Sequence, residues 1–217
     1  KNSNYASANI AATASVVEAA LNTEVRHLIF ISVVGANPNS KNAYFRSKGA
    51  AEKLISDSGI MASVLRTPIL LGPGTAGSQP ILGMVSSGQT RVLGGGNYQM
   101  RPLDIDDLSE ALVKLCHNHP EGTTTHELVG PISFSYRDII SKTAQLMGKS
   151  VEIGSVPIWV AKIASAITST LKGGGITPTV IDVITQDEVI ETNADEAIGI
   201  TLTSLENTLQ KMINSGD

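Results

Sequence analysis

A tyrosine and a lysine stand four residues apart in this sequence, at Tyr44 and Lys48. On a helix this spacing places the phenol and the ammonium on one face, within reach of a common ligand. A fixed positive charge favours the phenolate, so Lys48 is expected to lower the pKa of Tyr44 from its ordinary value of ~10. The pair could then work as a general acid or base. The same spacing is more often found on a solvated helix face, so the surrounding elements must decide between a reactive pair and an ordinary exposed face.

A serine hydroxyl precedes this pair by about a dozen residues. Ser32 lies near the end of residues 27–34, a nearly continuous apolar run rich in β-branched and aromatic residues that Gly35 closes. Such a run predicts a parallel strand covered on both faces. Open α/β sheets bind ligands at the carboxyl ends of their strands, so we expect Ser32 to lie near Tyr44.

The flanking segments alternate between helix and strand. Apolar residues recur at helical spacing over residues 9–21, a second helix is expected over residues 42–57, and residues 62–71 predict another buried strand. Parallel neighbours need a long connection that returns across one face of the sheet, which these helices supply. Further helices are expected over residues 79–87, 107–117 and 136–147, and a short strand over residues 126–130.

The chain changes character beyond Lys149. Residues 158–171 carry an apolar stripe that Gly173 to Gly175 should stop, and two more helices are expected over residues 179–185 and 204–213. We therefore predict an α/β fold: residues 1–150 form the C-terminal half of a doubly wound, Rossmann-like parallel sheet, and residues 151–217 form a mainly helical lobe over the carboxyl ends of its strands. The apolar stripe is expected to pack against the sheet domain rather than against a membrane.

Composition excludes several classes of protein. The 217 residues are 41% hydrophobic and 17% charged, an ordinary globular profile. A net charge of −4, with scattered Lys and Arg, gives no basic field for nucleic acid. A single cysteine, Cys116, excludes an internal disulfide and favours a reducing, cytoplasmic location. No apolar run reaches the ~18 residues of a transmembrane helix. Because the chain opens with Lys1 inside an apparent helix, we expect sequence upstream, where a targeting peptide could lie.

Three other patterns compete for a role in binding. Asp104, Asp106 and Asp107 precede an apolar-periodic segment, which favours a helix cap over a metal site. The four histidines show no zinc-ligand spacing, so no metal is predicted. Residues 72–77 fit Gly-x-Gly-x-x-Gly, but Pro73 removes one amide donor and no acidic strand end follows about twenty residues later. An ordinary glycine-rich loop is the favoured interpretation.

Taken together, the order of these motifs resembles the extended and atypical short-chain dehydrogenases. This family includes nucleoside-diphosphate-sugar epimerase-like members and an accessory subunit of respiratory NADH:ubiquinone oxidoreductase. The buried strand with Ser32, the Tyr44/Lys48 pair and the Gly72-Pro73-Gly74 turn carry the resemblance, and residues 101–111 and 127–131 extend it over most of the chain.

The resemblance implies a role for each site residue. Tyr44 would be the acid/base, Lys48 would lower its pKa and bond the nicotinamide ribose of NAD or NADP, and Ser32 would orient a substrate oxygen. The backbone of three successive residues would line the nicotinamide pocket, and an arginine would meet an anionic group such as a nucleotide phosphate; these residues are Thr67, Pro68, Ile69 and Arg101. The substrate would be a small molecule or a nucleotide sugar.

Two departures from the family pattern leave the activity open. Many extended members carry the working hydroxyl where this chain has Val33, so Ser32 could be structural. The glycine-rich first turn is absent, and we expect the family's first three or four strands to precede Lys1. The chain is therefore an NAD(P)-dependent oxidoreductase or epimerase, a non-catalytic NAD(P)H-binding sensor or scaffold subunit of a larger complex, or an inert fragment. The choice between NAD and NADP stays open.

Overall fold

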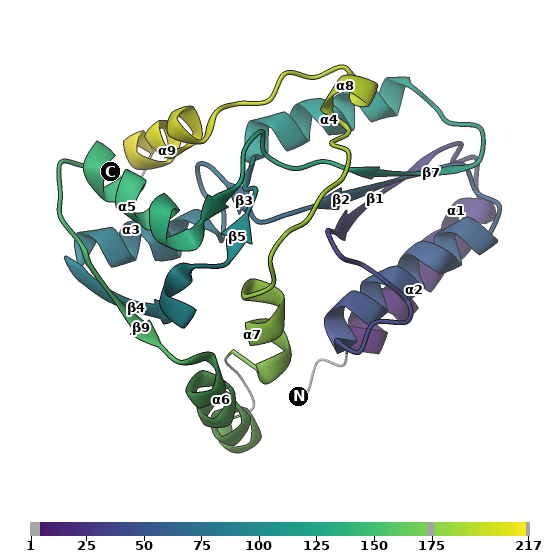
Figure 1. The fold of residues 1–217 in the computed structure, drawn as a ribbon. Coiled ribbons are helices and arrows are strands. Elements are labelled where there is room, and N and C mark those ends of the chain that lie inside the picture. Colours follow the sequence, from purple (N-terminus) through teal and green to yellow (C-terminus); the bar gives the residue numbers. More distant parts are fainter. Residues whose placement is uncertain (1–4, 173–175, 216–217) are drawn as a thin grey trace. The chain divides into compact units, whose positions relative to one another are not determined.

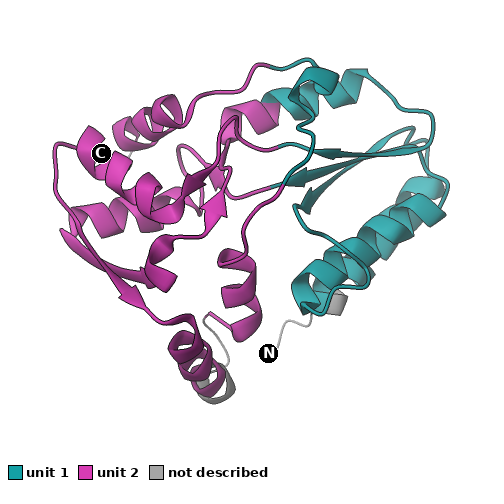
Figure 2. Cartoon of the chain, in the orientation of Figure 1, with its two compact units in different colours: residues 1–67, 110–128, 190–200 teal, residues 68–109, 129–189, 201–217 magenta. Residues whose placement is uncertain are grey.

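The computed structural model describes residues 5–172 and 176–215 (Figure 1). The chain divides into two compact units that interleave along the sequence (Figure 2). Unit 1 holds residues 1–67, 110–128 and 190–200, and unit 2 holds residues 68–109, 129–189 and 201–217. The domain boundary predicted after residue 150 coincides with no division between these units, so it stays a prediction.

Unit 1 is built on a three-stranded parallel sheet. Its strands β1 (Leu28–Val33), β2 (Ala62–Thr67) and β7 (Thr123–Glu127) lie in the order β1-β2-β7. Leu28 is opposite Ala62, and Ala62 is opposite Thr123. The predicted parallel pairing of the first two strands is confirmed.

Helices cover both faces of this sheet (Figure 1). The π-helix η1 (Ala6–Ala11), α1 (Ala12–Leu21) and α2 (Ala43–Asp57) lie on one face, where α1 and α2 bury an apolar cluster against β1. The C-terminal part of α4 (Ile105–His117) and the short α8 (Asp195–Ile198) lie on the other face. Helices on both faces of a parallel sheet define the doubly wound plan.

Asn42 caps the N-terminus of helix α2. Asn42 is extended, and its side chain accepts hydrogen bonds from the backbone amides of Tyr44 and Phe45, which satisfies two donors of the first turn. Gly49 lets the preceding loop approach closely, because a Cβ there would lie 2.3 Å from the nitrogen of Pro38. The cap and the glycine together fix the turns that carry Tyr44 and Lys48.

Two strand predictions need correction. The expected strand over residues 62–71 breaks into β2 and β3 (Leu70–Leu71), because Pro68 has no amide hydrogen for a sheet ladder. The strand expected over residues 126–130 instead spans Thr123–Glu127. Its threonines are β-branched and suit a strand, but they carry no apolar alternation that would reveal it.

Unit 2 combines small sheets with helices. β3 pairs with β6 (Leu103–Asp104) and β4 (Gln89–Leu93) with β9 (Glu152–Val156), both in parallel, while β5 (Gln99–Met100) and β8 (Phe134–Ser135) pair antiparallel. No sequence pattern predicts β4 and β9, because their residues are largely polar or exposed. Three helices supply most of the apolar core around them: α3 (Ser78–Ser86), α5 (Tyr136–Leu146) and α9 (Leu205–Asn214).

The remaining elements of unit 2 are the 3₁₀ turn η2 (Gly94–Gly96), α6 (Ile158–Lys172) and α7 (Pro178–Ile184). Trp159 is 67% exposed on α6 and Ile163 is 55% exposed, whereas the sequence favours packing of this stripe. The predicted glycine stop at residues 173–175 lies outside the described residues. No helix in the described part of the chain is long and apolar enough to cross a membrane.

Candidate functional site

Tyr44 lies in the first turn of α2 and is half-buried. Its ring meets that of Tyr5 edge-on at a centroid distance of 5.7 Å and lies 5.9 Å from the ring of Phe45. Burial, and secondarily the neighbouring Tyr5, raise the pKa of Tyr44 above its ordinary value. The lowered pKa expected from the sequence is therefore wrong for the protein without a ligand, and its phenol is protonated at neutral pH.

Lys48 follows one helical turn later and is held against β1. Its ammonium donates a hydrogen bond to the carbonyl of Ile31 at 3.1 Å and lies 5.0 Å from the ring centre of Phe30. Burial lowers the pKa of Lys48, while the negative charge of Glu52 opposes that shift. Tyr44 and Lys48 thus lie one turn apart on α2, as the spacing predicts, and Lys48 turns toward β1.

Ser32 is buried on the face of β1 that α2 covers, and its hydroxyl donates to the carboxylate of Glu52 at 2.5 Å. Glu52 stands two helical turns beyond Tyr44, so this bond directs the hydroxyl along α2 and away from the first turn. Val33 projects from the opposite face, because side chains alternate along a strand. A substrate-orienting role for Ser32 stays a prediction, and the structure adds a definite structural partner.

A charged network that the sequence did not reveal continues from Ser32. The carboxylate of Glu52 accepts from Nε of Arg66 at 3.0 Å and from Nη2 at 2.7 Å. Nη1 of Arg66 donates to Glu127 at 3.2 Å. Strand register explains the alignment, since Arg66 is opposite Ser32 on one side and Glu127 on the other. The four-residue spacing of Lys48 and Glu52 was the one sign in the sequence that Glu52 belongs to this face of the helix. Its partners Ser32 and Arg66 could be predicted only from the strand register.

The predicted lining of the nicotinamide pocket lies where β2 ends. Thr67 is buried, and its hydroxyl donates to the carbonyl of Ser32 at 3.4 Å. Its own carbonyl accepts from the amide of Val34 at 3.1 Å. Pro68 is buried, and Ile69 packs against the core of unit 2. The structure places Thr67 at the carboxyl end of the sheet, and the contact of these residues with a cofactor stays a prediction.

Arg101 belongs to unit 2 and is tied to the backbone there. Its Nε donates to the carbonyl of Gly130 at 2.8 Å and its Nη2 to that of Pro131 at 3.0 Å. Its amide donates to Glu188 at 2.7 Å, and burial raises the pKa of that carboxyl although Arg101 opposes the shift. A guanidinium has five N–H donors. Contact of Arg101 with a substrate anion therefore stays a prediction. In the structure, Arg101 holds the backbone at Gly130 and Pro131.

The acidic run beside Arg101 opens α4. Oδ1 of Asp104 accepts from the amide of Asp106 at 2.8 Å, as in a cap. The same run holds the C-terminal segment, because Lys211 contacts Asp104 at 3.2 Å and Asp106 at 2.7 Å, and Asp107 accepts from the hydroxyl of Thr203 at 2.6 Å. Among the described residues, no three His, Cys, Asp or Glu side chains gather closely enough to hold a metal ion.

The glycine-rich segment after β3 forms an ordinary loop into α3. The amide of Gly72 donates to the hydroxyl of Ser78 at 3.0 Å, and Pro73 has no amide hydrogen. Two of the donors that a phosphate would need are thus missing from this turn. The loop borders a mainly apolar pocket of about 490 Å³ together with Ile105.

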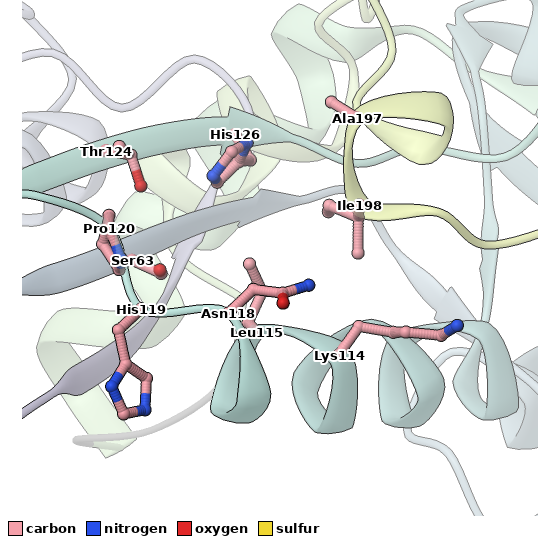
Figure 3. A pocket seen from close by; sticks show the side chains of 10 residues that line it. All are labelled: Ser63, Lys114, Leu115, Asn118, His119, Pro120, Thr124, His126, Ala197 and Ile198. Carbon is pink, nitrogen blue, oxygen red and sulfur yellow. The ribbon is translucent and has the colours of Figure 1, made fainter.

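A second pocket, of about 250 Å³, lies on the α4 face of the unit 1 sheet (Figure 3). Ser63, Thr124 and His126 line it from the strands. Within the described residues, Oγ1 of Thr124 is the one buried side-chain polar atom without a hydrogen-bond partner. Burial lowers the pKa of His126. These groups lie on the sheet face opposite Tyr44 and Lys48.

Solved structures share this fold over nearly the whole chain. The structure titled MoeE5 in complex with UDP-glucose and NAD is 18% identical, with a TM-score of 0.71 over 95% of this chain and 70% of that chain. The crystal structure of gox2253 is 16% identical, with a TM-score of 0.74 over 99% of this chain and 73% of that chain. UDP-glucuronic acid 4-epimerase from Bacillus cereus, in complex with UDP-glucuronic acid and NAD, is 18% identical, with a TM-score of 0.71 over 95% and 66%.

No protein-family model and no curated protein matches the chain. At these identities the similarity establishes the fold, and the predicted α/β, doubly wound class is confirmed.

Proposed function

We propose that the protein is an NAD(P)-dependent oxidoreductase or epimerase of the short-chain dehydrogenase type, with Tyr44 as acid/base and Lys48 as its partner. The observation that carries the proposal is the placement of both side chains. They are half-buried one turn apart on α2, and Lys48 is bonded to the carbonyl of Ile31, in the C-terminal half of a parallel strand. Open α/β sheets bind ligands at this edge.

The fold neighbours support both the cofactor and the substrate class. MoeE5 is solved with NAD and UDP-glucose, the Bacillus cereus epimerase with NAD and UDP-glucuronic acid, and RMD from Pseudomonas aeruginosa with NADPH. We therefore propose a nicotinamide dinucleotide as cofactor, without choosing between NAD and NADP. We propose a hydroxyl of a small molecule or nucleotide sugar as the reacting group, with Arg101 as a contact for an anionic group of that substrate.

The described residues fit the nicotinamide end of such a cofactor. Lys48 brings an ammonium and Tyr44 a phenol, which are the donors that a ribose hydroxyl would need, and the turn at Thr67, Pro68 and Ile69 would supply the pocket wall. The pyrophosphate end finds no equivalent turn in residues 72–77, where the amide of Gly72 is already bonded. When bound, the nicotinamide accepts or supplies hydride.

The chain's own residues manage the proton. In reduction, the protonated Tyr44 gives its proton to the carbonyl oxygen while hydride reaches the carbon. In oxidation, Tyr44 must first lose its proton. The raised pKa of Tyr44 in the ligand-free site disfavours this loss, and a positive charge nearby favours it by stabilising the phenolate. Lys48 supplies this charge one turn away. Epimerisation joins the two directions at one carbon, with hydride returning to the opposite face.

A second candidate is a non-catalytic NAD(P)H-binding sensor or scaffold subunit. The observation that supports it is the bond between Ser32 and Glu52, which engages the hydroxyl that the sequence predicts to orient a substrate oxygen. The raised pKa of Tyr44 points the same way. Binding of the cofactor would then serve to report its redox state or to hold a larger assembly together.

Replacing Tyr44 by Phe separates these candidates in the full-length protein. The enzyme is expected to lose roughly 10²- to 10⁴-fold in turnover on a panel of alcohols and sugar nucleotides, with cofactor binding kept, because only the transferable proton is gone. Tyr5→Phe is the matched control, since it removes a hydroxyl beside the same ring. Tight cofactor binding without turnover in wild type and Tyr44→Phe alike would contradict catalysis and favour the sensor or scaffold.

A further inference from the structure

Glu52 is a buried and heavily hydrogen-bonded side chain near the proposed site. It is 8% exposed, yet its carboxylate accepts one hydrogen bond from Ser32 and two from Arg66. Three donors, two of them from the Arg66 guanidinium, satisfy this carboxylate, and such charge-assisted hydrogen bonds are the strong ones. Glu52 is therefore held in one place, facing the sheet.

This charge lies on the same helical face as Lys48 and Tyr44. The three residues follow one another at intervals of four, which is one turn of α2. Lys48 bonds the carbonyl of Ile31, and Glu52 accepts from the hydroxyl of Ser32, the next residue of β1. Two successive turns of the helix are thus fixed to two successive residues of one strand.

The contact with Arg66 extends this attachment to the neighbouring strand. Arg66 belongs to β2 and also bonds Glu127 of β7, so the network joins α2 to all three strands of the unit 1 sheet. The negative charge of Glu52 also favours the ammonium form of Lys48, which burial disfavours. Position and charge of the site therefore depend on the same carboxylate.

We propose that Glu52 is a positioning residue of the Tyr44/Lys48 site, whose buried carboxylate fixes α2 to Ser32 and Arg66 and so holds Lys48 at the carbonyl of Ile31. The catalytic consequence rests on the proposed function; the effect on Lys48 does not. A purely structural ion pair would stabilise the sheet without any specific effect on Lys48.

Glu52→Gln and Glu127→Gln form a matched pair for the test. Each removes one carboxylate from Arg66, but only Glu52 also contacts Ser32 and shares a helix face with Lys48. Titration of Lys48, followed by NMR of its labelled side chain in the full-length protein, should move to lower pH in Glu52→Gln and stay unchanged in Glu127→Gln. Glu52→Asp, which keeps the charge, should restore most of the shift.

Turnover is the second measurement. Glu52→Gln should lose up to about 10²-fold in kcat, as expected when a reacting group is misplaced by about an ångström, and Glu127→Gln should stay within about twofold of wild type. If Glu52→Gln does not fold, Glu52→Gln/Arg66→Gln removes both charges at once and leaves no lone buried ion. It should displace the Lys48 titration in the same direction but by less, because the positive charge of Arg66 is lost together with the negative charge of Glu52.

The outcomes separate the two proposals. Equal titration of Lys48 in wild type and in Glu52→Gln, or an equal displacement in Glu127→Gln, would overturn the role of Glu52. If wild type shows neither turnover nor cofactor binding while the displacement is specific to Glu52→Gln, the proposed function fails and the control of Lys48 by Glu52 stands.

Discussion

The two faces of the unit 1 sheet hold polar groups in opposite ways. On the α2 face, Ser32, Glu52 and Arg66 form a network in which every charge has a partner. On the α4 face, a pocket contains Thr124, whose buried hydroxyl has no partner among the described residues, and His126, whose pKa burial lowers. One face holds its charges in ion pairs, and the strands of the other present unpaired or weakly held polar groups to a small pocket.

The difference follows from strand alternation. Ser32 and Arg66 are opposite each other in the register, so their side chains project together toward α2. Ser63 projects to the other face, and its hydroxyl bonds the ring of His27 at 2.9 Å. A preorganised charge is useful beside a reacting group. This contrast supports the proposal that chemistry takes place on the α2 face rather than on the α4 face.

Replacing Arg66 by Met tests the charged face with the largest expected effect. The side chain of Glu52 is 10% exposed and would be left without its main partner. Removing one member of a buried pair typically costs about 3–5 kcal/mol of unfolding free energy. Urea denaturation at neutral pH measures the loss. A loss below about 1 kcal/mol would mean that the network is solvated, and the two faces would no longer differ.

Replacing Thr124 by Val tests the opposite face, and the expected sign is reversed. An unpaired buried hydroxyl costs about 1–3 kcal/mol, so an apolar group of similar shape should leave the protein as stable or raise its unfolding free energy by about 1 kcal/mol. The same urea titration reports the change. A clear destabilisation would show that the hydroxyl has a partner in solution, and the α4 face would then resemble the α2 face.

The pH dependence of stability gives the smallest effect. Burial, and then the neighbouring His119, lower the pKa of His27, so the unfolded chain binds a proton at higher pH than the folded protein does. The contribution is fully present above the unfolded pKa of ~6.5 and is lost as the pH falls through the lowered folded value. Melting temperatures between pH 5 and 8 should therefore fall on the acid side, and less steeply in His27→Gln. Identical slopes would contradict the assignment.

Apolar periodicity and residue spacing predicted much of the fold and part of the candidate site. The parallel strands β1 and β2 and the helix with Tyr44 and Lys48 follow from local patterns of apolar residues and spacing. The partners of Ser32 do not, because Glu52 and Arg66 come together through strand register, which no local pattern encodes. The pKa of Tyr44 was predicted in the wrong direction for a similar reason. Its burial against Tyr5 is a tertiary contact that outweighs the charge one turn away.

The most direct measurement of the central claim compares NADH and NADPH binding by full-length wild type, Lys48→Met and Lys53→Met, followed by nicotinamide fluorescence. Lys53 is on the same helix, but its side chain is 65% exposed and paired with Asp57, so it is a matched loss of charge away from the site. Lys48→Met should weaken binding about tenfold or more, as expected for loss of a charged hydrogen bond, and Lys53→Met should not change it. Equal affinity of all three proteins for both dinucleotides would contradict the placement of a nicotinamide beside Lys48 and Tyr44.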